Sequence, residues 1–276
     1  ENTQPLAPTG KAGRNLPAAV SSAVVLIALL VASLLVVQGL FVGFVCCIAL
    51  LGLWELGGAF ARVGTHIALA PLYLGAIGMM VCAWLLGPEA LTMALYLTVF
   101  AVVVWRLIDA PTPSRIADIT ASVFSAIYVP FLACFVVLML REFRSPAVIG
   151  VYVAVTCFND IGGWLVGILC GKHPMAPRLS PKKSWEGFIG SLAFCIGTGV
   201  GGFYLLGATW WWGLIAGVCG CVCATIGDLT ESLIKREVGL KDMSALIPGH
   251  GGVLDRVDSL VMTAPVFYVI FLLALR

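Results

Sequence analysis

The sequence predicts an all-α integral membrane protein with about nine transmembrane helices and a polar site that faces the cytoplasm. Hydrophobic residues make up 61% of its 276 residues, charged residues only 11%, and the mean hydropathy is +1.05. A soluble domain of this length could not bury so much apolar surface. The apolar residues also form runs of about twenty, the length that an α-helix needs to cross a bilayer.

The apolar runs follow one another along most of the chain. Residues 1–16 are polar, and we expect them to form a disordered cytoplasmic tail. The run that begins at Pro17 is too long for one helix, so a turn near Gln38 is expected to divide it. The predicted spans are 17–37, 39–60, 67–86, 90–108, 117–140, 147–171, 188–207, 210–230 and 259–275. We therefore distinguish an N-terminal membrane region, 17–140, from a C-terminal one, 147–276, that carries the polar motifs.

Basic residues are distributed unevenly between the two ends of these spans. With a cytoplasmic N-terminus, three of the sixteen Lys and Arg residues lie on the outer side, namely Arg141, Arg144 and Arg276. The other thirteen lie on the cytoplasmic side, as the positive-inside rule requires. The distribution predicts a multi-pass protein of the cell (inner) membrane with the loops 172–187 and 231–258 in the cytoplasm.

Two carboxyl groups lie within apolar runs, where a charged side chain is costly. Asp160 lies in the middle of one run, and Asp228 lies near the end of another. A helix that continues beyond Asp228 would place Ser232 and Lys235 on the same face. Carboxylates bind hard cations such as Mg²⁺, whereas interfacial salt bridges are the alternative explanation.

Two further acidic residues, Glu55 and Asp118, also lie within predicted spans. Each of them fits a packed, protonated or paired residue that supports the fold. For both, this structural interpretation is favoured over a part in the chemistry.

The loop 172–187 contains a cluster of cations and hydroxyl groups. Lys182 and Lys183 lie between Ser180 and Ser184, and Pro181 favours an extended turn. A triphosphate or an anionic lipid headgroup would suit this cluster. The alternative is an ordinary basic loop that binds anionic lipids without specificity.

A longer polar segment runs from Ser232 to Asp258. It combines carboxylates for a hard cation, Lys and Arg for phosphate, and glycines that let the backbone approach an anion. Its chemistry-bearing residues are Ser232, Lys235, Arg236, Lys241, Asp242, Ser244, the run Pro248-Gly-His-Gly-Gly252, Asp255, Arg256 and Asp258.

This segment resembles the signature of the phosphatidate cytidylyltransferases, also called CDP-diacylglycerol synthases. It matches each element of the family pattern, which is Ser-x-hydrophobic-Lys-Arg, Lys-Asp four residues later, a small residue, Pro-Gly-His-Gly-Gly and Asp-Arg-x-Asp. Upstream, the stretch 180–187 is similar to the family's Ser-Pro-Lys-Lys-Thr-Trp-Glu-Gly and departs from it at Ser184. The N-terminal spans match only as generic hydrophobic helices.

The resemblance implies that CTP and phosphatidate react to give CDP-diacylglycerol and pyrophosphate, in the catalytic region 147–276. The lipid phosphate would attack the α-phosphorus of CTP in line. Mg²⁺ is the expected cofactor, and a second, monovalent ion is left open. The expected partners are CTP, phosphatidate and membrane lipids, with a homodimer as the assembly and without nucleic acid.

The resemblance also implies roles for individual residues. Asp228 and Asp255 would bind the divalent metal, with Asp258 as a further ligand or as support for the ligands. The expected catalytic residues are Asp228, Asp255, Asp258, Lys235 and Arg256. The expected substrate-binding residues are Ser180, Lys182, Lys183, Ser232, Arg236, Lys241, His250, Gly251, Gly252 and Asp160.

Two other classes of protein handle similar chemistry. A transporter of anionic substrates also carries buried acids in broken apolar runs, but no inverted repeat is apparent in this sequence. A CDP-alcohol phosphotransferase also acts on CDP-lipids, but its Asp-Gly-x-x-Ala-Arg motif is absent. Both interpretations are weaker than the cytidylyltransferase.

Overall fold

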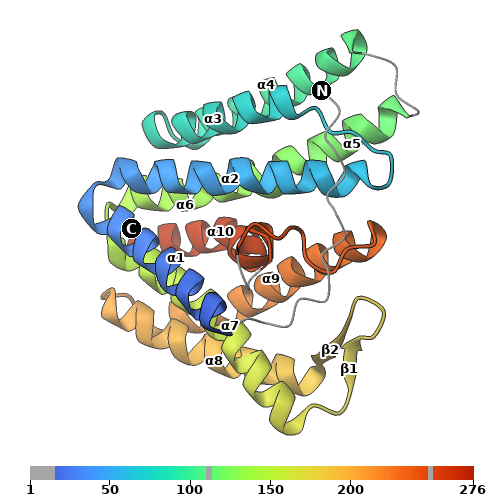
Figure 1. The fold of residues 1–276 in the computed structure, drawn as a ribbon. Coiled ribbons are helices and arrows are strands. Elements are labelled where there is room, and N and C mark those ends of the chain that lie inside the picture. The colour runs from blue at the N-terminus through green and yellow to red at the C-terminus, as the bar shows by residue number, and fades with distance from the viewer. Residues whose placement is uncertain (1–15, 110–113, 248–250) are drawn as a thin grey trace. The chain divides into compact units, whose positions relative to one another are not determined.

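The computed structural model describes residues 16–109, 114–247 and 251–276. The expected cytoplasmic tail therefore lies outside the described residues, apart from its last one. The chain divides into two compact units. Figure 1 labels most of the helices and strands of both. Unit 1 runs to Leu138 and takes in Lys235–Val257, and unit 2 comprises Met139–Ile234 and Asp258–Arg276.

Unit 1 is built from the N-terminal helices. They are α1 (Leu16–Val36), α2 (Gln38–Ala61), α3 (Leu69–Leu85), α4 (Pro88–Ile108), α5 (Arg115–Ala126), the π-helical turn η1 (Ile127–Phe131) and the start of α6 (Leu132–Phe143). Val37 is extended and separates α1 from α2, which confirms the turn expected near Gln38. Pro130 lies within η1, where the missing N–H of proline suits a local break in the helical hydrogen-bond pattern.

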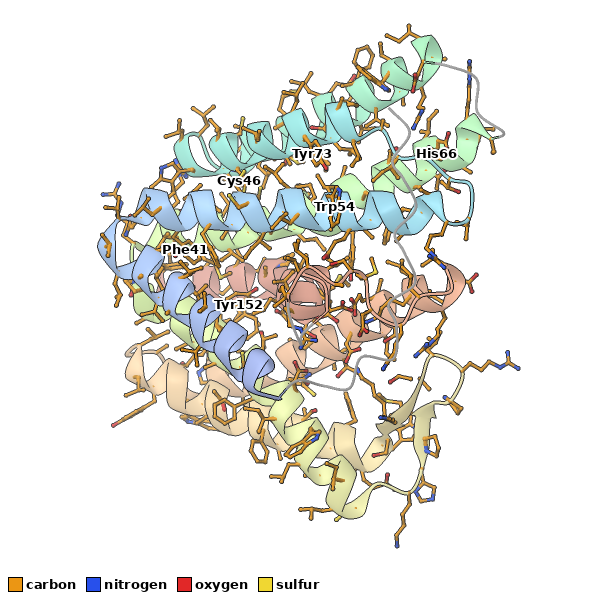
Figure 2. The ribbon with its side chains drawn as sticks, in the orientation of Figure 1. Phe41, Cys46, Trp54, His66, Tyr73 and Tyr152 are labelled. Carbon is orange, nitrogen blue, oxygen red and sulfur yellow. The ribbon has the colours of Figure 1, made fainter. Side chains whose placement is uncertain are left out.

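The helix α2 contributes a large part of the core of unit 1. Leu53 and Leu56 of this helix are fully buried, as are Leu72 and Met79 of α3. Figure 2 shows Phe41 and Trp54 along α2, and Tyr73 on the neighbouring α3. Glu55 is the one charged residue of α2, and it is buried among apolar neighbours of the same helix.

Unit 2 contains a helix pair joined by a short β-hairpin. The helices are α7 (Pro146–Cys170) and α8 (Trp185–Leu205), and the strands are β1 (Pro174–Ala176) and β2 (Ser180–Ser184), which pair antiparallel. The unit also contains most of α9 (Trp210–Glu237) and of α10 (Leu254–Leu275). Tyr152 of α7, labelled in Figure 2, donates its hydroxyl to the carbonyl of Leu260 in α10 at 2.5 Å.

Glycines let α7 and α8 approach each other closely. A Cβ added at Gly190 would lie 2.5 Å from Cβ of Val166 and 2.8 Å from the carbonyl oxygen of Gly162. A Cβ at Gly163 would lie 2.7 Å from Oγ of Ser191. These helices therefore meet backbone to backbone, as small residues permit between membrane helices.

The predicted spans correspond to helices of the structure. Within the described residues, seven helices are long and apolar enough to cross a membrane, and α3, with 17 residues, is shorter. This agrees with an all-α integral membrane protein, while the number of nine spans stays a prediction. The sequence suggested an extended turn at Pro181. In the structure this residue lies in strand β2 of a β-hairpin, which was not predicted.

The glycine contact between α7 and α8 can be tested within one helix. Gly190→Ala should destabilise the protein by about 1–3 kcal/mol, because the added methyl group overpacks the contact. Gly197→Ala is the matched control, since a Cβ there would meet nothing within 4 Å. Thermal unfolding of both variants in detergent measures the difference. Equal melting temperatures would contradict the close contact.

The orientation of unit 2 in the membrane is also open to test. Arg144 precedes α7 and the hairpin follows it, so α7, with 25 residues and a length of about 37 Å, separates them. In a cysteine-free background, Arg178→Cys should react with an impermeant thiol reagent only after the cytoplasmic side is opened. Arg144→Cys should react in intact cells. Labelling of both from one side would contradict the predicted topology.

Candidate functional site

Unit 2 contains a polar pocket with a volume of about 230 Å³. It is formed by side chains of α7, the hairpin, α8 and α9. Four of the residues predicted from the sequence, Asp160, Lys182, Lys183 and Asp228, line it together. The remaining lining residues are Asn159, Gly163, Trp164, Met175, Ser184, Gly187, Phe188, Ser191 and Thr225.

The pocket carries charges of both signs. Nζ of Lys183 lies 2.6 Å from Oδ2 of Asp228, and both side chains keep contact with solvent, at 24% and 33% exposure. Oγ of Ser232 donates to the other oxygen of Asp228 at 3.3 Å. Because α9 is helical through Glu237, Ser232 lies one turn beyond Asp228, as the sequence predicted.

Backbone and amide contacts fix the α7 side of the pocket. Nδ2 of Asn159 donates to Oδ1 of Asp160 at 3.1 Å. Oγ of Ser191, on α8, donates to the carbonyl of Asn159 at 2.6 Å. Asn159 and Ser191 were not predicted, and their closeness depends on the glycine contact between the two helices.

The hairpin is anchored at its base. Oγ of Ser184 accepts a hydrogen bond from the backbone N–H of Gly187 at 3.1 Å and caps the start of α8. Glu186 accepts from the backbone N–H groups of Lys172 and His173, at 3.1 and 3.2 Å, and lies 2.5 Å from the His173 ring. These contacts hold the strand that carries Lys182 and Lys183 against the first turn of α8.

Unit 1 holds the predicted signature residues around Asp255. Nζ of Lys235 lies 2.7 Å from Oδ1 of Asp255, and the two side chains are 14% and 4% exposed. Oδ2 of Asp255 accepts from the backbone N–H groups of Met243 at 2.9 Å and Gly252 at 2.7 Å. Asp255 therefore organises the loop that precedes α10 as well as carrying a charge.

Glu55 is the residue of this region whose contacts sequence reasoning missed. Its side chain has no exposed surface. Oε1 accepts from Oγ of Ser244 at 2.5 Å and from the N–H of Val253 at 2.8 Å, and Oε2 accepts from the N–H of Leu254 at 2.7 Å. The only signal in the sequence was a lone acid in an apolar span, and its partner segment could not be identified from that.

The other predicted residues occupy different surroundings. Arg236, Lys241 and Arg256 are exposed, and Ser180 is half-buried at the start of β2 without lining the pocket. Asp258 is buried in α10, where its Oδ1 accepts from the N–H of Ser259 at 2.7 Å. Gly251 has a φ of +86°, a conformation that glycine adopts readily. His250 lies outside the described residues.

The carboxylates fit a hard cation by their chemistry. Asp228 and Asp255 each already hold a positively charged lysine nitrogen, at 2.6 and 2.7 Å. Oxygen donors of this kind are the usual ligands of Mg²⁺. Among the described residues of either unit, however, no three His, Cys, Asp or Glu side chains lie together as a metal site.

Comparison with known proteins gives concordant matches. The model of the cytidylyltransferase family matches residues 17–274. The chain is 35% identical to the phosphatidate cytidylyltransferase of Mycobacterium bovis over 98% of its length and 92% of that protein. It is 35% identical to that of Mycobacterium tuberculosis H37Rv, covering 98% of the chain and 86% of the relative, and 34% identical to that of Mycobacterium leprae, covering 94% and 88%.

Proposed function

The chain belongs to the cytidylyltransferase family, and from this membership we propose that it transfers a cytidylyl group from CTP to phosphatidate. The products are CDP-diacylglycerol and pyrophosphate. The observation that carries the proposal is the similarity to mycobacterial phosphatidate cytidylyltransferases, which extends over 98% of the chain. Helices apolar enough to cross a membrane suit a lipid substrate.

The reaction forms one bond to phosphorus and breaks another. A phosphate oxygen of phosphatidate attacks the α-phosphorus of CTP, and the bond from that phosphorus to the bridging oxygen breaks as pyrophosphate leaves. Such a transfer needs positioning and neutralisation of charge more than a covalent nucleophile. The proposed site residues are accordingly charged groups on a rigid scaffold.

The pocket of unit 2 suits a phosphate group that carries a metal counter-ion. Lys182 and Lys183 supply positive charge for phosphate oxygens, whereas Asp160 and Asp228 would repel a bare polyphosphate. Charges of both signs in one small pocket favour a phosphate and a cation bound together. Lys183, which is paired with Asp228, would then pass from its carboxylate to the phosphate.

The metal assignment follows the sequence prediction. Asp228 and Asp258 of unit 2 and Asp255 of unit 1 are each proposed as ligands of divalent metal, which we propose to be Mg²⁺. A bound ion of this kind would stabilise the charge that develops on the leaving pyrophosphate. Lys235, paired with Asp255, is proposed to neutralise phosphate charge, as are the exposed Arg236, Lys241 and Arg256. A cytoplasmic site in the cell membrane and a homodimer complete the proposal.

One assay tests the proposed reaction against its rivals. The purified full chain, given CTP, phosphatidate and Mg²⁺ in mixed micelles, should release pyrophosphate and form CDP-diacylglycerol. Omission of phosphatidate is the control and should stop both. CMP release from CDP-diacylglycerol and an alcohol would identify a phosphotransferase. Substrate uptake by proteoliposomes with neither product would identify a transporter, and either result would overturn the proposal.

Substitutions in the pocket test its part in the reaction. Lys182→Ala should lower turnover by roughly tenfold to a thousandfold, the effect of losing one or two charge-assisted contacts. Asp228→Asn should reduce it further, because the amide cannot replace a carboxylate ligand. Lys172→Ala is the matched control, since Lys172 is exposed in the same loop and does not line the pocket. Near-normal turnover in Lys182→Ala and Asp228→Asn would exclude the pocket from the site.

A further inference from the structure

We propose that Glu55 of α2 is a positioning residue for the cytidylyl transfer. It binds the hydroxyl of Ser244 and the backbone N–H groups of Val253 and Leu254, and so sets the orientation of Asp255. The inference rests on the proposed function, and it concerns an acid 189 residues before Ser244, the nearest of its partners along the chain. All the contacts that carry it lie within unit 1.

Glu55 and Asp255 divide the donors of the loop between them. Met243 donates its N–H to Asp255, and the next residue, Ser244, donates its hydroxyl to Glu55. Nine residues later, Gly252 donates to Asp255 and Val253 to Glu55. In each of two short stretches, one residue donates to Asp255 and the next residue donates to Glu55. A shift of either carboxylate would therefore displace the donors of the other.

The bond to Leu254 ties Glu55 to the start of α10. The first N–H groups of a helix have no partner within the helix, and a carboxylate is favoured there by the helix dipole. Glu55 satisfies the N–H groups of Val253 and Leu254, and Asp255 follows in the first turn. Glu55 of α2 therefore helps to fix the start of α10 and, with it, the direction in which the Asp255 side chain points.

Steric contacts show how tightly this arrangement is packed. A Cβ at Gly252 would lie 2.6 Å from Oε1 of Glu55 and 3.0 Å from Oδ2 of Asp255. Gly251, with its positive φ, would place a Cβ 3.0 Å from the same oxygen of Asp255. The Gly-Gly pair of the signature is thus required by the two carboxylates, which leave no room for a side chain between them.

A second contact from α2 supports the same segment. Arg62, at the end of that helix, donates from Nε to the carbonyl of Val238 at 3.1 Å. Residues 55 and 62 are seven apart, two turns of helix, and lie on one face. This face of α2 therefore binds the signature segment at Val238, near the start of that segment, and again at Val253 and Leu254, near its end. The N-terminal helix α2 thus helps to position the residues of the signature.

The experiment compares two buried acids of unit 1. Glu55→Gln keeps the size of the side chain but turns an amide N–H₂ toward a backbone donor. Asp118→Asn is the matched control, because Asp118 is 1% exposed and accepts from the N–H of His66 instead of the loop. For each, kcat and KM for CTP, the melting temperature and amide hydrogen exchange of the full chain in detergent are measured.

We expect Glu55→Gln to lower kcat by about tenfold to a hundredfold with little change in KM, as for a misplaced reacting group. Amide exchange at Val253 and Leu254 should accelerate by about tenfold or more, because their acceptor is lost. Asp118→Asn should keep kcat within about twofold after correction for the folded fraction. Equal losses of kcat in both variants, or an unchanged kcat in Glu55→Gln, would overturn the proposal.

Ser244→Ala covers the case in which Glu55→Gln does not fold. It removes one hydrogen bond to Glu55, together with the bond that the Ser244 hydroxyl accepts from the N–H of Leu246. It should lower kcat by roughly threefold to tenfold and accelerate amide exchange at Val253 and Leu254. An unchanged kcat there would overturn the positioning role. If the wild-type chain forms no CDP-diacylglycerol, the proposed function fails. Faster amide exchange in these variants, confined to Val253, Leu254 and their neighbours, would then still support the positioning by Glu55. Unchanged exchange at these residues would overturn it.

Discussion

Irregular backbone in an apolar protein must find hydrogen-bond partners, and in unit 1 two carboxylates supply them. Asp255 accepts from two backbone N–H groups of the signature loop, and Glu55 accepts from two more and from a hydroxyl. Each unpaired group in such surroundings would cost several kcal/mol, so these hydrogen bonds hold the backbone at Met243 and at residues 252–254 in place. Backbone outside helices and strands can therefore be held in one conformation at these positions, because its hydrogen bonds end on side chains.

Both units pair an aspartate with a lysine. Lys183 holds Asp228 in unit 2, and Lys235 holds Asp255 in unit 1. The first pair is partly exposed in the pocket, whereas the second is nearly buried. Leaving the nearly buried Asp255 without a cation would be costly, so Lys235 acts as its counter-charge.

The sequence was most informative where the determinants are local. The apolar runs predicted the helices well, and the spacing of Asp228 and Ser232 predicted their place on one helix, because helical periodicity relates near neighbours. The pairing of Lys183 with Asp228 could not be derived, since the two residues are on different elements. Glu55 was interpreted as structural for the same reason, because no pattern in the sequence links α2 to Ser244 or Val253. The β-hairpin was not predicted, because its two strands are short and their sequence has the composition of a basic loop.

The distance along the chain between Glu55 and its partners has a consequence for biosynthesis. Ser244 is made 189 residues after Glu55, which at about 5–20 residues per second takes roughly 10–40 s. During this interval α2 must be inserted with an acid that lacks its final partners. A charged group at the centre of a helix costs about 2.5–3.5 kcal/mol, which is an upper bound for Glu55 because it lies six residues from the end of α2. The remaining side chains of α2 are apolar enough to carry it. Once the signature segment has been made, Ser244, Val253 and Leu254 donate hydrogen bonds to Glu55. The acid that made insertion of α2 less favourable then stabilises the finished fold.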